Sequence, residues 1–290
     1  MTRKIAGCTL LGIAVLAAGR GAGGECTWNG SVSTEWTTAG NWTGGLPGAG
    51  DVVVVPSGTS FAPAIPAGTN PVSGAYASFT VAKGATVTCL GDPAAVNEPS
   101  GGTVAKPHGI GVTIFATNAM IDGTLSAVGK GFPGGQGPGF TSDGGGTHGG
   151  KGTFGYPLWQ IPFHRAASYG SVSEPTALGS GGHGGLDRSG GGAILLAVED
   201  SLTVNGMIDA TAAQVARSGS GGSIWLTATT LAGTGTIRAD GGNSAYGSSG
   251  GGGRVAIVYA HSTFSGLVSV AGGSGTLLGQ PGSLWEPKRF

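Results

Sequence analysis

The 290-residue chain is poor in charged residues, and the few that it has form no cluster. Asp, Glu, Lys and Arg make up only 10% of the sequence, and they cancel to a formal net charge of zero. Nucleic-acid binding requires grouped Lys and Arg side chains that displace counterions from phosphates. A polybasic patch for anionic lipids requires the same grouping. The charge pattern therefore excludes nucleic acid as a partner and gives no basis for electrostatic membrane binding.

Long apolar runs are also scarce, and the clearest one is short and lies at the N-terminus. Arg3 and Lys4 precede an apolar run from Ile5 to Ala18, which small residues follow. This order is typical of a secretory signal peptide, and the run is too short for a comfortable membrane span. We expect residues 1–24 to be a signal peptide, the mature protein to be secreted or held at the cell surface, and no membrane span to remain.

Cysteine is nearly absent, because only Cys26 and Cys89 remain once the signal peptide is removed. An even pair in an exported protein suggests a disulfide. We expect a Cys26–Cys89 bond, with two buried free thiols as the alternative.

Glycine is what the chain has in excess, with 63 Gly beside 15 Pro. That share is in the range of low-complexity sequences, but 39% of the residues are apolar and they are patterned. The glycines follow no strict Gly-X-Y period, which excludes a collagen triple helix. The composition therefore points to an ordered, glycine-rich fold.

Several segments repeat one pattern of alternating apolar and polar residues on both sides of a central glycine. The segments are 77–91, 111–129, 191–211, 221–242 and 252–273. Period-two alternation indicates strands with one buried face, and a unit of two short strands must stack on its neighbours to bury that face. A propeller blade would need four strands. We predict an all-β right-handed parallel β-helix (a solenoid), with its coils in residues 76–290.

The alignment of the repeats also predicts which side chains stack. One inward stack should contain Ile194, Ile224 and Val255, and another should contain Ile208, Ile237 and Val268. Outward positions should be occupied by Thr227, Thr229, Thr236, Arg238 and Asp240. Asp122, Asp209 and Asp240 are spaced like a solvated ladder on successive coils.

Residues 25–75 are rich in tryptophan, with Trp28, Trp36 and Trp42 ahead of an apolar strand, Val52 to Val55. We expect an N-terminal cap here, because the open end of a solenoid must be shielded. The alternative is an exposed aromatic platform for sugar rings.

A long glycine-rich insertion, residues 129–192, interrupts the repeats. We expect tight turns or polyglycine-like passes along one flank. His148 and His183 stand in matching HGG contexts and could ligate zinc or copper with Asp143 and Asp187, but their spacing fits no known zinc template. Turn histidines are the favoured interpretation, so no metal or cofactor is expected.

Aromatic residues are concentrated in the middle of this insertion. The candidate ligand patch contains Tyr156, Trp159, Phe163, Arg165 and Tyr169. Exposed aromatic and Arg side chains dominate binding hot spots. The alternative is that the stretch packs as a cover over the coils.

The sequence "WNGSVSTEWTTAGNWTGGLPGAGDVVVV" resembles a motif of large secreted and autotransporter-like bacterial surface proteins. The later "GGGAILL", "GGSIWL" and "GGGGRVAIVY" resemble glycine-rich parallel β-helix segments of bacterial adhesin-like proteins. The resemblance covers most of the mature chain and implies a β-helix with an adhesive or structural role.

Catalytic motifs are weak. A GHG triplet at 182–184 resembles a polygalacturonase motif, but no paired DD accompanies it, and no HExxH occurs. We therefore expect a secreted, non-enzymatic structural or adhesin-like protein whose partner is a surface glycan or another extracellular protein. The alternative is a carbohydrate-active β-helix enzyme, a polysaccharide lyase or hydrolase, which should show a groove with carboxylates beside a Lys or Arg.

Overall fold

The computed structural model describes residues 23–95, 108–142, 144–153, 166–215 and 217–287. In these ranges the chain is built from β-strands, together with one short 3-10 helix, η1 (Ala39–Asn41). The predicted all-β class is confirmed. No helix within the described ranges is long and apolar enough to cross a membrane. Nearly all of the predicted signal peptide, residues 1–22, lies outside them.

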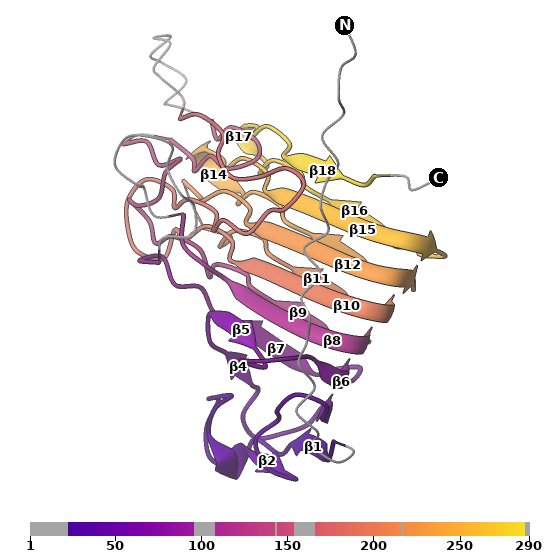
Figure 1. The fold of residues 1–290 in the computed structure, drawn as a ribbon. Helices are drawn as coiled ribbons and strands as arrows, with labels where there is room; N and C mark the ends of the chain where they lie inside the picture. The colour runs from indigo at the N-terminus through magenta and orange to yellow at the C-terminus, as the bar shows by residue number, and fades with distance from the viewer. Residues whose placement is uncertain (1–22, 96–107, 143, 154–165, 216, 288–290) are drawn as a thin grey trace, which may run out of the picture.

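Ten strands form a large sheet that is parallel except for the pair β1–β2. Its order is β18 (Ser283–Trp285), β15 (Arg254–Ser262), β12 (Ser223–Ala232), β10 (Ala193–Val204), β8 (Val112–Ile121), β6 (Tyr76–Val81), β3 (Val52–Val55), β1 (Glu25–Trp28) and β2 (Trp42–Thr43), with β5 (Gly68–Asn70) paired to β8 off this path. Figure 1 shows the strands rising as successive steps, from indigo β1 to yellow β18.

Six short strands form a second, small sheet. Its order is β16 (Leu267–Ser269), β13 (Thr236–Arg238), β11 (Met207–Asp209), β9 (Thr124–Ser126), β7 (Thr86–Cys89) and β4 (Ala64–Ile65), and β14 (Ser244–Ser248) pairs separately with β17 (Gly275–Leu277). All of these pairs are parallel. Each repeat thus gives one longer strand to the large sheet and then one short strand to the small sheet, and successive repeats lie side by side.

The interior lies between the two sheets and contains the predicted stacks. Ile194 pairs with Ile224, which pairs with Val255, and none of the three is more than 1% exposed. In the small sheet, Ile208 and Ile237 are fully buried, and Ile237 pairs with the partly buried Val268. Both predicted stacks are confirmed. Each fully buried aliphatic side chain stabilises the fold by about 1.5–3 kcal/mol.

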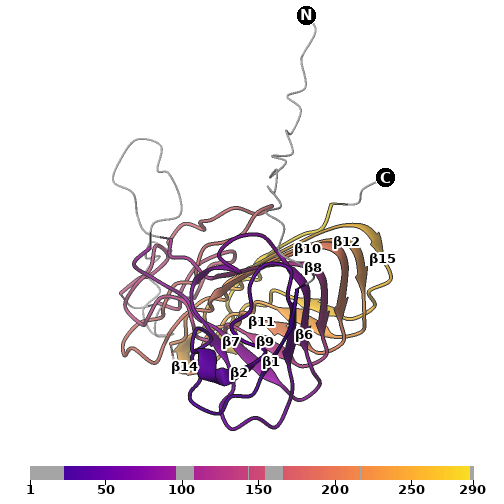
Figure 2. The same ribbon diagram turned by 60° about the horizontal axis from the view of Figure 1, so that its bottom comes forward.

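Three tryptophans close the N-terminal end of this interior. Trp28, Trp36 and Trp42 are at most 5% exposed. Their ring centroids lie 4.6–6.1 Å apart, and the Nε1 groups of Trp28 and Trp42 donate to the carbonyls of Phe61 and Trp36, both at 2.8 Å. Figure 2 brings this end forward. The tryptophans are packed side chains of the N-terminal end and offer no exposed platform to sugars.

The central glycine of each repeat lies where the chain turns from the large sheet to the small sheet. A Cβ on Gly206 would lie 1.9 Å from the carbonyl oxygen of Gly123, one on Gly235 would lie 2.3 Å from that of Gly206, and one on Gly266 would lie 2.0 Å from that of Gly235. Real side chains do not approach so closely. The recurring glycine is therefore required because the turns of neighbouring repeats stack backbone on backbone.

Glycine-rich passes return the chain from the small sheet to the large one. Gly191 N–H donates to the Ser220 carbonyl, Gly221 N–H to that of Gly251, and Gly251 N–H to that of Gly146, each at 2.9 Å. We name the described parts of 129–153, 176–192, 212–222, 240–253 and 271–282 the glycine layer. The predicted insertion supplies Gly146, and its glycine passes share one hydrogen-bonded layer with the glycine runs of the later repeats.

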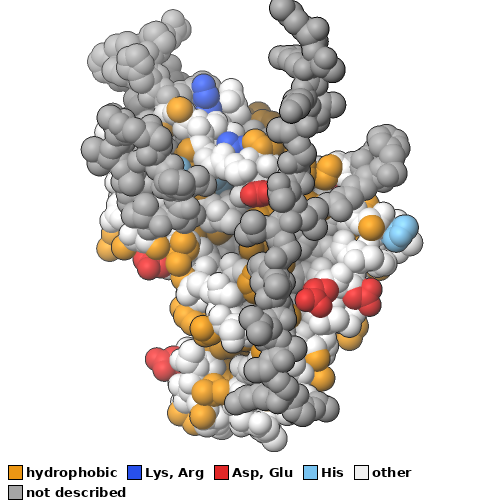
Figure 3. Space-filling view, viewed as in Figure 1, with side chains coloured by type: hydrophobic (Ala, Val, Ile, Leu, Met, Phe, Trp, Pro, Cys, Tyr) orange, Lys and Arg blue, Asp and Glu red, His pale blue; other side chains and the backbone are white. Residues whose placement is uncertain are grey.

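Charged side chains are scattered over the molecular face in Figure 3. They are few, because only 10% of the residues are charged.

Candidate ligand-binding groove

Most of the predicted aromatic patch, Tyr156, Trp159, Phe163 and Arg165, lies outside the described residues. Tyr169 is described and half-buried. Its hydroxyl donates to the Leu178 carbonyl at 2.6 Å, lies 2.8 Å from Ser180 Oγ, and its ring lies 4.6 Å from that of His148. Tyr169 therefore ties the glycine layer together, and its hydroxyl already has partners within the protein.

The two HGG histidines occupy different environments. His148 is fully buried, and its Nδ1 donates to the Gly221 carbonyl at 3.0 Å. Burial, assisted by the positive charge of Arg254, lowers the pKa of His148 to about 3. His183 is half-buried, Asp187 is exposed, and Asp143 is not among the described residues. Across the described ranges, no three His, Cys, Asp or Glu side chains gather closely enough to hold a metal ion.

The predicted Cys26–Cys89 disulfide is not formed, and both cysteines are buried free thiols. Cys26 belongs to the large sheet and pairs with Val53, whereas Cys89 belongs to the small sheet and pairs with Ile65. Burial raises the pKa of Cys26, with a further contribution from the negative charge of Asp51, and burial alone raises that of Cys89. The alternative reading of the sequence, two buried thiols, describes this structure.

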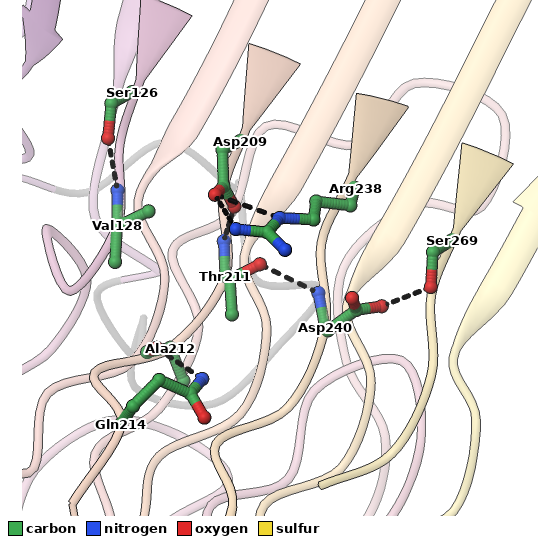
Figure 4. A network of polar contacts seen from close by, with 9 residues as sticks. All are labelled: Ser126, Val128, Asp209, Thr211, Ala212, Gln214, Arg238, Asp240 and Ser269. Atoms are coloured by element: carbon green, nitrogen blue, oxygen red, sulfur yellow. Dashed lines mark hydrogen bonds and ion pairs between the residues drawn. The ribbon is translucent and has the colours of Figure 1, made fainter. Parts of the chain in front are cut away.

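A groove of about 480 Å³ crosses the small sheet where its strands run into the glycine layer. Its polar side chains come from successive repeats: Asp209, Thr211, Gln214, Arg238, Asp240, Asn243 and Ser274. They form rows because Asp209 is the register partner of Arg238, which in turn is the partner of Ser269. Figure 4 shows the first rows, with strand ends passing into loops below them. Stacked repeats thus bring together residues about thirty positions apart.

One ion pair lies on the floor of the groove. Asp209 is 2% exposed, its Oδ1 accepts the Thr211 backbone N–H at 2.9 Å, and its Oδ2 accepts Nε and Nη2 of Arg238 at 2.9 and 2.7 Å. These bonds to Asp209 raise the pKa of Arg238. The solvated ladder expected for Asp209 is therefore wrong, because its carboxylate is buried and charge-paired. Asp122 is held at another turn, where Asn205 Nδ2 donates to it at 2.8 Å.

The outer residues of the groove are held by the repeat that follows each of them. Asp240 Oδ1 accepts the Ser269 hydroxyl at 2.5 Å and the Ala271 N–H at 2.7 Å. Asn243 Oδ1 accepts the N–H and hydroxyl of Ser274 at 2.7 and 2.9 Å. Within the described part of the chain, the Asp240 Oδ2, Arg238 Nη1 and Asn243 Nδ2 atoms take part in none of these bonds. The side chains that line the groove are therefore held in place. Arg238 Nη1 and Asn243 Nδ2 can still donate hydrogen bonds to a ligand, and Asp240 Oδ2 can still accept one.

Sequence reasoning identified Arg238 and Asp240 as outward residues but did not join them to Thr211, Gln214 and Asn243. The spacing within the repeats could have joined these residues. Polar residues follow the inward Ile208 and Ile237 of the short strands at the same spacing of one, three and six positions. An alignment of the repeats that continued past the short strands would have placed these polar residues in neighbouring rows.

Comparison with known proteins gives no match for this chain among family models, curated proteins or solved structures.

Proposed function

We propose that the chain is an extracellular, non-enzymatic interaction protein, adhesin-like or matrix-like, built on a right-handed parallel β-helix. The secretory pattern of residues 1–24 supports export. Two sheets whose strands, apart from β2 and β5, pair in parallel and follow chain order support a solenoid. Parallel strands of one sheet are joined by right-handed crossovers in about 98% of cases, which supports a right-handed coil for the proposed β-helix.

The groove is the proposed contact site, and its ligand is a surface glycan. The observation that carries this proposal is that Asp240 and Asn243 are already held by Ser269, Ala271 and Ser274. Side chains fixed before binding lose little conformational entropy when a ligand arrives. Free donors beside a free carboxylate oxygen match sugar hydroxyl groups, which both donate and accept hydrogen bonds.

A glycan-array screen of the wild-type protein, followed by affinity measurements on each hit, tests this proposal. We expect Asp240→Asn and Asn243→Ala each to weaken binding about tenfold, which corresponds to ~1.4 kcal/mol. Asp187→Asn is the matched control, because Asp187 is exposed and does not line the groove. Wild-type affinity in both groove variants would remove the groove from the proposal.

The second candidate is a carbohydrate-active enzyme, and one observation favours it. Asp209 and Asp240 line the same groove as Arg238, which is the arrangement of carboxylates beside a cation expected for such an enzyme. Asp209, however, already accepts three hydrogen bonds. Reducing-sugar release, or formation of unsaturated products, on each array hit separates the candidates. Product release that disappears in Asp240→Asn would establish the enzyme and overturn the non-enzymatic proposal.

A further inference from the structure

A row of outward side chains crosses the large sheet, away from the groove. We name it the outer row, and its members follow one another as register partners. They are Thr69, Thr113, Leu195, Trp225, Ala256 and Trp285, from β5, β8, β10, β12, β15 and β18. None of the six carries a charge. Their neighbours along the strands, such as Ile194 and Ile224, fill the interior.

The tryptophans of the outer row do not belong to the interior. Trp225 and Trp285 are partly exposed, whereas Ile224 and Leu226 on either side of Trp225 are fully buried. Ala256, which lies between the two tryptophans in the row, is fully buried although it is not part of the interior cluster. Its register partners on the two neighbouring strands are Trp225 and Trp285. Strand spacing of ~4.8 Å places the two tryptophan backbones roughly 10 Å apart.

The same row carries polar groups beside its aromatic ones. The indole Nε1 of Trp225 is covered by the protein and has no hydrogen-bond partner in the described part of the chain, so the polar contacts open to a ligand lie elsewhere in the row. At the other end of the row, Thr69, Thr113 and Leu195 line a recess of about 250 Å³.

We infer that the outer row binds an uncharged polysaccharide chain lying across the strands. A sugar ring has an apolar C–H face that packs on an aromatic plane and a rim of hydroxyl groups that needs hydrogen-bond partners. Trp225 and Trp285 supply the planes, and Thr69 and Thr113 supply the polar contacts. The absence of charge within the six residues selects a neutral polymer, and the hydroxyl groups of Thr69 and Thr113, at the end of the row away from the tryptophans, match the hydroxyl groups of a sugar chain.

Co-sedimentation with insoluble cellulose and chitin, and affinity electrophoresis in soluble xylan, test this inference with the intact protein. We expect the wild type to bind at least one of the three polymers. The double variant Trp225→Ala, Trp285→Ala should lose at least tenfold in affinity, and Trp225→Phe, which keeps an aromatic plane but lacks the N–H, should lose less. Leu267→Ala is the control, since Leu267 is an exposed apolar residue of the small sheet.

Circular dichroism melting of each variant shows whether the loss reflects binding or unfolding, and Trp225→Phe gives a second measurement should the double variant fail to fold. Wild-type affinity in the double variant, or no binding of the wild type to all three polymers, would overturn the inference. A wild-type dimer that the double variant abolishes, without polysaccharide binding, would assign the row to self-association instead. Leu267→Ala should leave this binding unchanged, and Asp240→Asn is measured on the glycan-array hits of the groove, so the groove and the outer row succeed or fail separately.

Discussion

The stacked central glycines make a sharp prediction for Gly206→Ala. The new methyl group would lie 1.9 Å from the Gly123 carbonyl oxygen and 2.5 Å from that of Asp122. Both are backbone atoms, so the clash cannot be relieved by rotating a side chain. The turns before β9 and β11 would have to separate by about 1 Å, which also stretches the 2.8 Å hydrogen bond from Met207 N–H to the Gly123 carbonyl.

The expected loss combines two effects. Overpacking in a closely packed region costs about 1–3 kcal/mol, and a weakened backbone hydrogen bond costs up to ~1.5 kcal/mol. We therefore expect Gly206→Ala to lower the free energy of unfolding by about 2–4 kcal/mol. Gly48→Ala is the matched control, because the nearest atom to its added methyl group is Asp51 Oδ2 at 3.7 Å and its φ is not positive.

Urea denaturation followed by far-ultraviolet circular dichroism measures both changes. Gly48→Ala should be as stable as the wild type, or more stable by ~0.4–1 kcal/mol because alanine restricts the unfolded chain. If Gly206→Ala matches the wild type, the turns do not stack as closely as described, and the explanation for the recurring glycine is wrong.

Three further predictions address the interior, the thiols and the buried histidine. Ile237→Asp places a carboxylate in a fully buried stack and should destabilise the protein by roughly 3–5 kcal/mol; a wild-type melting temperature would place Ile237 outside the core. Without reductant, alkylation mapped by mass spectrometry should label Cys26 and Cys89 only after denaturation, since both are free and their pKa values are raised; a disulfide-linked peptide would contradict this. The pKa of His148 is about 3 in the folded protein against an ordinary 6.5, so between these values the unfolded chain binds the extra proton and stability falls as pH falls, by at most ~1.4 kcal/mol per pH unit. His148→Asn should flatten this part of the stability curve, and an unchanged curve would show that His148 does not titrate in this way.

The strands and their register were predictable because the fold depends on a period that the sequence displays. Side chains alternate across a strand, so Ile194, Ile224 and Val255 had to share a face once their repeats were aligned. The glycine layer was only partly predictable. Its order comes from backbone hydrogen bonds such as Gly221 to Gly251, and glycine has no side chain whose period could reveal which passes pair.

The candidate groove was harder to predict than the core. Asp209 looked like a surface residue in a sequence with few carboxylates, and its burial depends on Arg238 from the next repeat. Gln214 and Asn243 lie beyond the strands, where alternation ends. The disulfide prediction was wrong for a similar reason. The presence of two cysteines in an exported sequence does not indicate which sheet each cysteine joins.

The parallel stacking of the repeats also determines how the protein should respond to a mechanical load. Backbone hydrogen bonds between neighbouring repeats run along the direction in which the strands step from β1 to β18 (Figure 1). A force applied between these two strands therefore pulls the bonds apart lengthwise, and the repeats should open one at a time instead of shearing together. Register partners are 30 residues apart between β10 and β12 (Ile194 and Ile224) but 82 between β8 and β10 (Val112 and Ile194). Each repeat after β10 therefore releases roughly 100 Å of chain when it opens, and the repeat that holds the insertion releases far more. A protein of this build yields under tension in a series of separate steps, similar in length after β10 and longer at the insertion, and it dissipates a pull while its remaining repeats stay folded.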